Sequence, residues 1–124
     1  MTEIDQRKDM AALLAQIHRE FRQGLPDRLG RIRGSLERLS AGYDRAAADL
    51  FYRTAHSLKG TAPSFGADGL VEPAAALSAI GRRWLEGGAV PADEIPGARE
   101  QFERLGTAVR EFIDAAERRS EGEA

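Results

Sequence analysis

The chain has 124 residues with 18 basic and 20 acidic side chains, and its formal net charge at pH 7 is −2. This length suits one domain, so we expect a single domain over residues 1–124. The acidic balance argues against a nucleic-acid partner, which would favour a basic face. The absence of cysteine excludes disulfides, thiolate nucleophiles and cysteine metal sites.

Two further classes of segment are missing from the sequence. No apolar run approaches the roughly 20 residues that a membrane-spanning helix needs. The N-terminus also lacks the basic region and apolar stretch of a secretory signal. We therefore expect a cytoplasmic protein without a membrane partner.

The first helical pattern covers about residues 5–23, where apolar side chains recur at helical spacing. Gly24-Leu25-Pro26 interrupts it, yet the apolar stripe resumes in phase and continues to a C-cap glycine, Gly42. Either one long helix is kinked here, or a short helix ends and a second begins with Pro26 in its first turn. We favour a break or a sharp kink, with the first piece acting as an N-terminal lid.

The next helix is expected to begin after Asp44, a good N-cap residue, and to end at Gly66. Pro63 should bend it near its end, because the proline ring clashes with the carbonyl four residues earlier. Asp68 can cap a third helix that ends at Gly87-Gly88. Within that helix we expect Ser78 to lie on the surface.

A loop over residues 89–96 precedes the most regular apolar stripe, which runs from Ile95 to Ala116. The polar tail, residues 118–124, is expected to fray. Short connections between four or five such helices imply that neighbours are antiparallel. The sequence therefore predicts an all-α protein.

His56 lies on the polar side of the second helical pattern, about 180° from the centre of its apolar face. Tyr52, Lys59, Gly60 and Pro63 share that side, with Lys59 one turn after the histidine. A glycine within a helix costs roughly 1 kcal/mol, so Gly60 suggests close approach of another molecule. These neighbours suit a phosphoryl group on the imidazole, although periodicity alone equally allows an exposed histidine without a role.

The run His56-Ser57-Leu58-Lys59-Gly60, followed by Gly66 and Leu70, resembles the signature of histidine-containing phosphotransfer (HPt) domains. The resemblance covers roughly residues 13–116. It implies an antiparallel up-down-up-down four-helix bundle, here with an additional N-terminal helix or a kinked helix extension. We place the bundle core at about residues 25–117 and the N-terminal helix at about residues 5–23.

The same resemblance implies a function. His56 would accept a phosphoryl group from a receiver-domain aspartate and pass it to another receiver domain, and Lys59 would offset the arriving negative charge. Tyr52, Gly60 and Pro63 would form the contact patch, and a polar residue such as Ser64 would bond the imidazole or the phosphate. The expected partners are response-regulator receiver domains and a hybrid histidine kinase. We expect the protein itself to be a monomer.

Other chemistries find no support in the sequence. His18 and His56 lack metal-ligand spacing, so no metal site is expected, and His18 reads as a boundary residue of its helix. No phosphate-binding glycine loop with a following Lys-Ser or Lys-Thr occurs, which argues against an autonomous kinase. Any Mg²⁺ would belong to the partner receiver domain. The alternative function is an HPt-like helical adaptor that binds a signalling partner without being phosphorylated.

Overall fold

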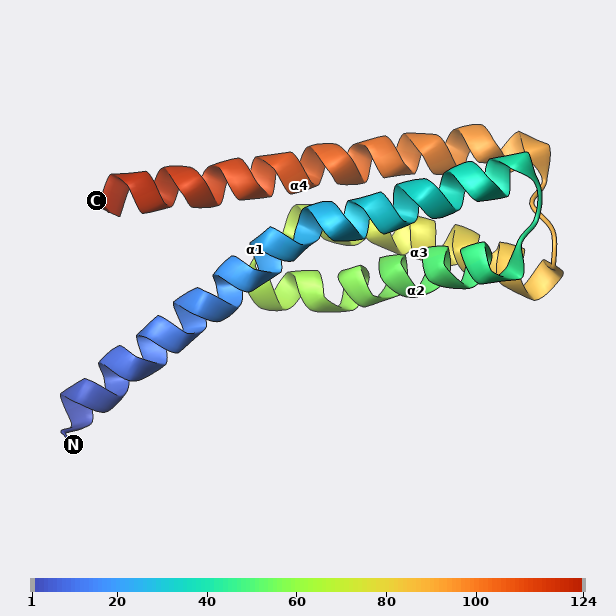
Figure 1. The fold of residues 1–124 in the computed structure, drawn as a ribbon. Coiled ribbons are helices and arrows are strands. Elements are labelled where there is room, and N and C mark those ends of the chain that lie inside the picture. Colours follow the sequence, from blue (N-terminus) through green and yellow to red (C-terminus); the bar gives the residue numbers. More distant parts are fainter. Residues whose placement is uncertain (1, 124) are drawn as a thin grey trace.

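A computed structural model describes residues 2–123, and within them it contains helices and no strand. Its four α-helices form an antiparallel bundle (Figure 1), so the all-α prediction is confirmed. The α-helices are α1 (Glu3–Ala41), α2 (Arg45–Thr61), α3 (Val71–Gly87) and α4 (Ile95–Glu123). Short 3-10 turns lie between them: η1 (Ala62–Phe65), η2 (Asp68–Leu70) and η3 (Ala92–Glu94).

Helix α1 runs without a break through Pro26, so the predicted break at this proline is wrong. Leu25 is fully buried, and the apolar stripe is in phase on both sides of the proline. One continuous helix can therefore keep the apolar residues before and after Pro26 on the same face. Pro26 itself is exposed, and it removes only one donor from the helical ladder. The axis of α1 changes direction as it leaves the bundle (Figure 1), which corresponds to the kinked extension.

The first half of α1 is not a lid on the bundle. It projects past the ends of α2 and α3 (Figure 1), and every described residue before His18 is exposed. Burial begins with Phe21 and Leu25. The prediction of an N-terminal lid is therefore wrong, because the first half of α1 extends past the ends of α2 and α3 and does not pack on the bundle.

The core lies where all four helices meet. Phe51 of α2 packs on Trp84 of α3, with their ring centroids 5.6 Å apart. The fully buried large side chains come from every helix: Leu25, Ile32, Leu39, Phe51, Leu58, Leu70, Leu77, Trp84, Leu105 and Val109. Phe102, a member of the predicted stripe on the last helix, is only half-buried, and the Arg33 guanidinium lies 5.5 Å above its ring.

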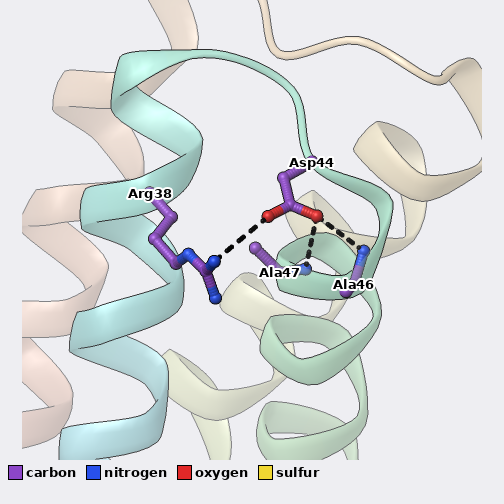
Figure 2. Close-up of polar contacts among 4 residues, drawn as sticks. All are labelled: Arg38, Asp44, Ala46 and Ala47. Atoms are coloured by element: carbon purple, nitrogen blue, oxygen red, sulfur yellow. Dashed lines mark hydrogen bonds and ion pairs between the residues drawn. The ribbon is translucent and has the colours of Figure 1, made fainter.

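The helix ends test the predicted caps. Asp44 accepts hydrogen bonds from the backbone N–H groups of Ala46 (3.0 Å) and Ala47 (3.4 Å), and Arg38 Nη2 lies 3.8 Å from its second oxygen (Figure 2). The prediction for Asp44 is thus confirmed. Asp68 caps nothing, because η2 precedes α3 and the residue before α3 is Leu70.

The last helix is longer than the sequence pattern suggests. It begins at Ile95, where a loop to residue 96 was expected, and continues to Glu123. The fraying expected for residues 118–124 stays a prediction, and residue 124 lies outside the described residues. No helix in the described part of the chain is long and apolar enough to cross a membrane.

Candidate functional site

Helix α2 presents His56 on its outer side. Thr54, Ala55 and Leu58 are buried against the other helices, whereas His56 and Ser57 are exposed. The helical period requires this alternation, because residues 54, 55 and 58 share a face that residue 56 does not. The imidazole is therefore accessible to a second molecule.

Tyr52 lies one turn before His56 and covers one side of its ring. The two ring centroids are 5.4 Å apart and the planes are inclined by 25°, which is a stacked arrangement. Tyr52 is half-buried, so its own ring is held in place by the bundle. This contact restricts the orientation of the imidazole.

Ser78 of α3 contacts the other edge of the imidazole, and the prediction that it lies on the surface is wrong. The residue is 5% exposed, and its hydroxyl oxygen lies 3.5 Å from Nδ1 of His56. Either the hydroxyl donates to Nδ1, or it accepts from a protonated Nδ1, depending on the tautomer. In both cases Nδ1 is the ring nitrogen that contacts α3, and Nε2 makes no hydrogen bond with the described residues.

Gly81 explains how Ser78 comes so close to His56. A Cβ atom on Gly81 would lie 2.8 Å from Cδ1 of Phe51 and 3.0 Å from the Cα of Tyr52, so only glycine allows this approach of α3 to α2. The two helices are antiparallel neighbours. Ser78, one turn before Gly81, is therefore set against His56, one turn after Tyr52.

The cations around His56 differ in whether they are already paired. Arg53 Nε donates to Asp49 at 3.0 Å. Arg82 Nε donates to Glu86 at 2.9 Å, and this hydrogen bond raises the pKa of Arg82 above its usual value. Lys59 is exposed and has no ion-pair partner within residues 2–122. It is thus the cation one turn from His56 that stays available to an anion.

Gly60 is exposed, and a Cβ atom there would meet nothing within 4 Å. Packing inside the protein therefore gives no reason for a glycine at this position, unlike Gly81. Because a side chain here would extend into open space beside His56, the glycine leaves room for a second molecule. The close approach of another molecule at Gly60 stays a prediction.

Pro63 and Ser64 lie beyond the end of α2, in the turn η1. The α-helical pattern stops at Thr61, and Gly66 ends the turn in the left-handed conformation with φ 69°. Both residues are exposed, and Ser64 makes no side-chain hydrogen bond within the described chain. In the structure, the hydroxyl group that contacts the imidazole of His56 is therefore that of Ser78, whereas the sequence suggested Ser64.

A basic groove between α1 and α2 adjoins this face. Two of its cations, Arg28 and Arg31, have no ion-pair partner among the described residues, and Nη1 of Arg28 is buried without a hydrogen-bond partner. Arg53 belongs both to the groove and to the side of α2 that carries His56. The lining residues are Arg28, Arg31, Leu50, Arg53, Thr54 and Ser57.

Within the described residues, the second histidine and the carboxylates do not gather into a cluster of metal-ligating side chains. His18 is half-buried, and its ring meets the edge of Phe65 at 5.1 Å, as expected for a boundary residue. The described residues contain no group of three or more His, Cys, Asp or Glu side chains that could hold a metal ion.

The structure thus combines an antiparallel helical bundle with a histidine exposed on α2 and a lysine one turn later that has no ion-pair partner among the described residues. The family model for the Hpt domain matches residues 16–119. The chain therefore belongs to the Hpt domain family, whose members are phosphocarrier modules, not kinases, and act in histidine phosphotransfer within phosphorelays. No curated protein and no solved structure matches the chain.

Proposed function

We propose that His56 is the phosphoacceptor of a phosphorelay, taking a phosphoryl group from a receiver-domain aspartate and passing it to a second receiver domain. The observation that carries this proposal is the exposed imidazole whose Nδ1 faces Ser78 at 3.5 Å, leaving Nε2 free. The Nε2 lone pair forms the N–P bond as the acyl-phosphate P–O bond breaks and the aspartate carboxylate leaves. Transfer to the second receiver is the reverse reaction.

The docking face for the receiver is the outer side of α2 around His56. Tyr52 supplies a partly apolar ring, Gly60 allows backbone approach, and Pro63 and Ser64 lie at the end of the helix. Receiver domains and the hybrid histidine kinase that carries one are the partners, and the receiver brings any Mg²⁺ that the transfer needs. The unpaired arginines of the basic groove favour an acidic rim on the partner.

The test is to incubate the full chain with receiver domains phosphorylated on aspartate and to follow the intact mass of both proteins. The proposal expects one receiver to lose its phosphoryl group while the chain gains one that is acid-labile. If a receiver binds tightly and no phosphoryl group moves, the chain is an adaptor and the carrier role is wrong. Binding and mass are therefore measured on the same mixtures.

Lys59→Ala is expected to slow phosphoryl transfer by about tenfold without changing the free energy of unfolding. The side chain is exposed and unpaired in the described chain, so its removal costs no packing. It does remove the cation one turn from His56, and charged hydrogen bonds are worth roughly 1.5–3 kcal/mol before solvent screening. Stopped-flow transfer kinetics measure the rate, and Lys59→Arg should restore most of it. An unchanged rate in Lys59→Ala would show that Lys59 is a solvated surface residue without a role in transfer.

Ser78→Ala is expected to slow transfer by a few-fold and to leave receiver binding unchanged. The substitution removes the hydroxyl beside Nδ1, so the imidazole samples more orientations and both tautomers. Because the residue is buried, a merely structural role would appear as lost stability with an unchanged rate per folded molecule. Transfer rates across pH 6–9, compared with Ser78→Thr as the hydroxyl-retaining variant, separate the two roles. Ser78 is therefore a positioning residue in this proposal.

A further inference from the structure

The basic groove between α1 and α2 lies on one side of His56. Around the axis of α2, at about 100° per residue, Arg53 and Ser57 are rotated from His56 by about 60° and 100° in one direction. Leu50 lies at about 120° in the same direction. All three line the groove, so this direction is the one toward α1. The imidazole therefore has the groove on its α1 side and the hydroxyl of Ser78 on its α3 side.

Arginine side chains give the groove its charge. The lining includes Arg28, Arg31 and Arg53 and no acidic residue. Arg28 and Arg31 have no ion-pair partner among the described residues, whereas Arg53 pairs with Asp49 at 3.0 Å. Because the whole chain has a formal net charge of −2, the positive potential is a local property of this face. An acidic group that enters the groove meets two cations that give up no ion pair to bind it.

The guanidinium of Arg28 is held in place by the bundle. Its Cζ lies 5.5 Å from the centre of the Phe21 ring, and the buried Phe21 ring stacks on Phe65 with centroids 4.2 Å apart. Nη1 of Arg28 is buried and has no hydrogen-bond partner among the described residues. A guanidinium fixed in this way loses little conformational freedom when it binds a carboxylate. Arg28 is therefore suited to recognising an anion at a defined position.

Leu50 adds an apolar surface to the basic lining. It is a large hydrophobic residue with an exposed fraction of 44%, and it lies in the groove with Thr54 and Ser57. Leu50 and Ser57 are seven residues apart, which corresponds to about 10 Å along α2. The groove therefore fits a short segment of a partner that carries acidic side chains and an apolar one.

The open space at Gly60 lies on the same side of His56 as the groove. Gly60 is rotated from His56 by about 40° toward α1, and a Cβ atom there would meet nothing within 4 Å. On the α3 side, by contrast, Arg82 is already bound to Glu86 at 2.9 Å. A molecule that reaches the imidazole can therefore extend over Gly60 to the unpaired arginines of the groove.

We propose that the basic groove recognises an acidic segment of the receiver domain that exchanges phosphoryl groups with His56. This inference rests on the proposed function, because it takes the receiver as the partner. Acidic side chains of the segment pair with Arg28 and Arg31, and an apolar side chain covers Leu50. Attraction between the groove and the segment steers the encounter, so the groove sets the rate of association and selects among receivers by their surface charge.

Arg31→Glu tests the charge of the groove, and Arg99→Glu is its matched control. Both arginines are exposed and have no ion-pair partner among the described residues. Each substitution replaces a positive charge with a negative one, so the two variants have the same net charge. Arg99 lies on α4, which packs against α1 and α3. Circular dichroism checks that both variants retain the bundle.

The probe is a receiver domain that carries a fluorescent label and is phosphorylated on its aspartate. Stopped-flow measurements over a range of receiver concentrations give the association rate constant and the transfer rate at saturation. At low salt, Arg31→Glu should lower the association rate constant about tenfold and leave the saturated transfer rate unchanged, while Arg99→Glu changes the former less than about twofold. At about 1 M salt, where the Debye length is about 3 Å, the difference between the variants should disappear.

Leu50→Ala tests the apolar part of the groove. It should speed dissociation of the receiver several-fold and leave the salt dependence of association unchanged, because loss of an apolar contact acts mainly on the dissociation rate. Leu13→Ala is the matched control, since Leu13 has a similar exposed fraction of 50% but lies on the part of α1 that projects beyond the bundle (Figure 1). It should leave dissociation unchanged.

Equal association rate constants for Arg31→Glu and Arg99→Glu would overturn the inference, because the groove would then contribute only to the overall charge. A difference that persists at high salt would also overturn it, since the effect would not be electrostatic. Failure of the proposed function looks different: the unaltered chain gains no phosphoryl group from any receiver. A receiver that binds without transfer still reports on the groove, because the label measures association independently of phosphoryl transfer.

Discussion

Replacing His56 with glutamine is expected to abolish phosphoryl uptake while the bundle stays folded. Glutamine keeps a polar side chain of similar size on an exposed site, so no packing is lost. The amide nitrogen of glutamine has no nucleophilic lone pair at pH 7, and no other residue near Lys59 can take the place of the imidazole. Intact-mass measurement after incubation with a phosphorylated receiver should show no phosphoryl gain, against one group on the unaltered chain.

The chain offers a matched control for this variant in its second histidine. His18→Gln changes a half-buried residue on α1 that contacts Phe65, and it should leave phosphoryl uptake unchanged apart from a small loss of stability. If His56→Gln still takes up a phosphoryl group and His18→Gln does not, the acceptor lies on α1 and our assignment to α2 is wrong. Loss of receiver binding in His56→Gln would mean that the imidazole is needed for docking rather than for chemistry.

Gly81→Ala is expected to lower the free energy of unfolding by up to about 2 kcal/mol and to slow transfer. The added methyl group meets Phe51 and the backbone of Tyr52 at about van der Waals overlap, and overpacking of this kind costs roughly 1–3 kcal/mol. The better helix propensity of alanine returns about 1 kcal/mol of that cost. Relief of the overlap pushes α3 away from α2 and carries Ser78 away from His56. Urea denaturation measures the stability, and transfer kinetics measure the second effect.

Gly30→Ala separates the packing effect from helix propensity. Gly30 lies inside α1 and a Cβ atom there meets nothing within 4 Å, so alanine should stabilise the protein by about 0.5–1 kcal/mol. Opposite signs for the two substitutions would support a close contact at Gly81. Stabilisation by Gly81→Ala as well would show that α3 has room to move and that the α2–α3 distance is not set by this glycine.

Local sequence signals were sufficient for the elements of the bundle and for several of their ends. The apolar stripes gave the helices their buried faces, and Asp44 and Gly42 marked a boundary because capping depends on residues within a few positions. The same local rules allowed a break or a sharp kink at Pro26, and the break is wrong. Burial of Leu25 and of the residues that follow it outweighs one lost hydrogen bond, and this tertiary term is invisible in a local pattern.

The outer face of α2 was predictable from periodicity, but its support from α3 was not. Ser78 falls beside Leu77 and one turn before Gly81, so its place in the buried stripe was a visible signal for burial. Its contact with His56 depends on the register of α3 against α2, which the glycine contact sets between residues distant in sequence. Ser64, close to His56 in the sequence, lies instead past the end of the helix.

The central claim is that His56 carries the phosphoryl group on the ring nitrogen that makes no hydrogen bond with the described residues. Heteronuclear NMR of the ring nitrogens in ¹⁵N-labelled protein, recorded before and after transfer from a phosphorylated receiver, tests this most directly. Our account predicts that Nε2 of His56 becomes the phosphorylated nitrogen while Nδ1 keeps its contact with Ser78. A phosphoryl group on His18, or on Nδ1 of His56, would contradict it.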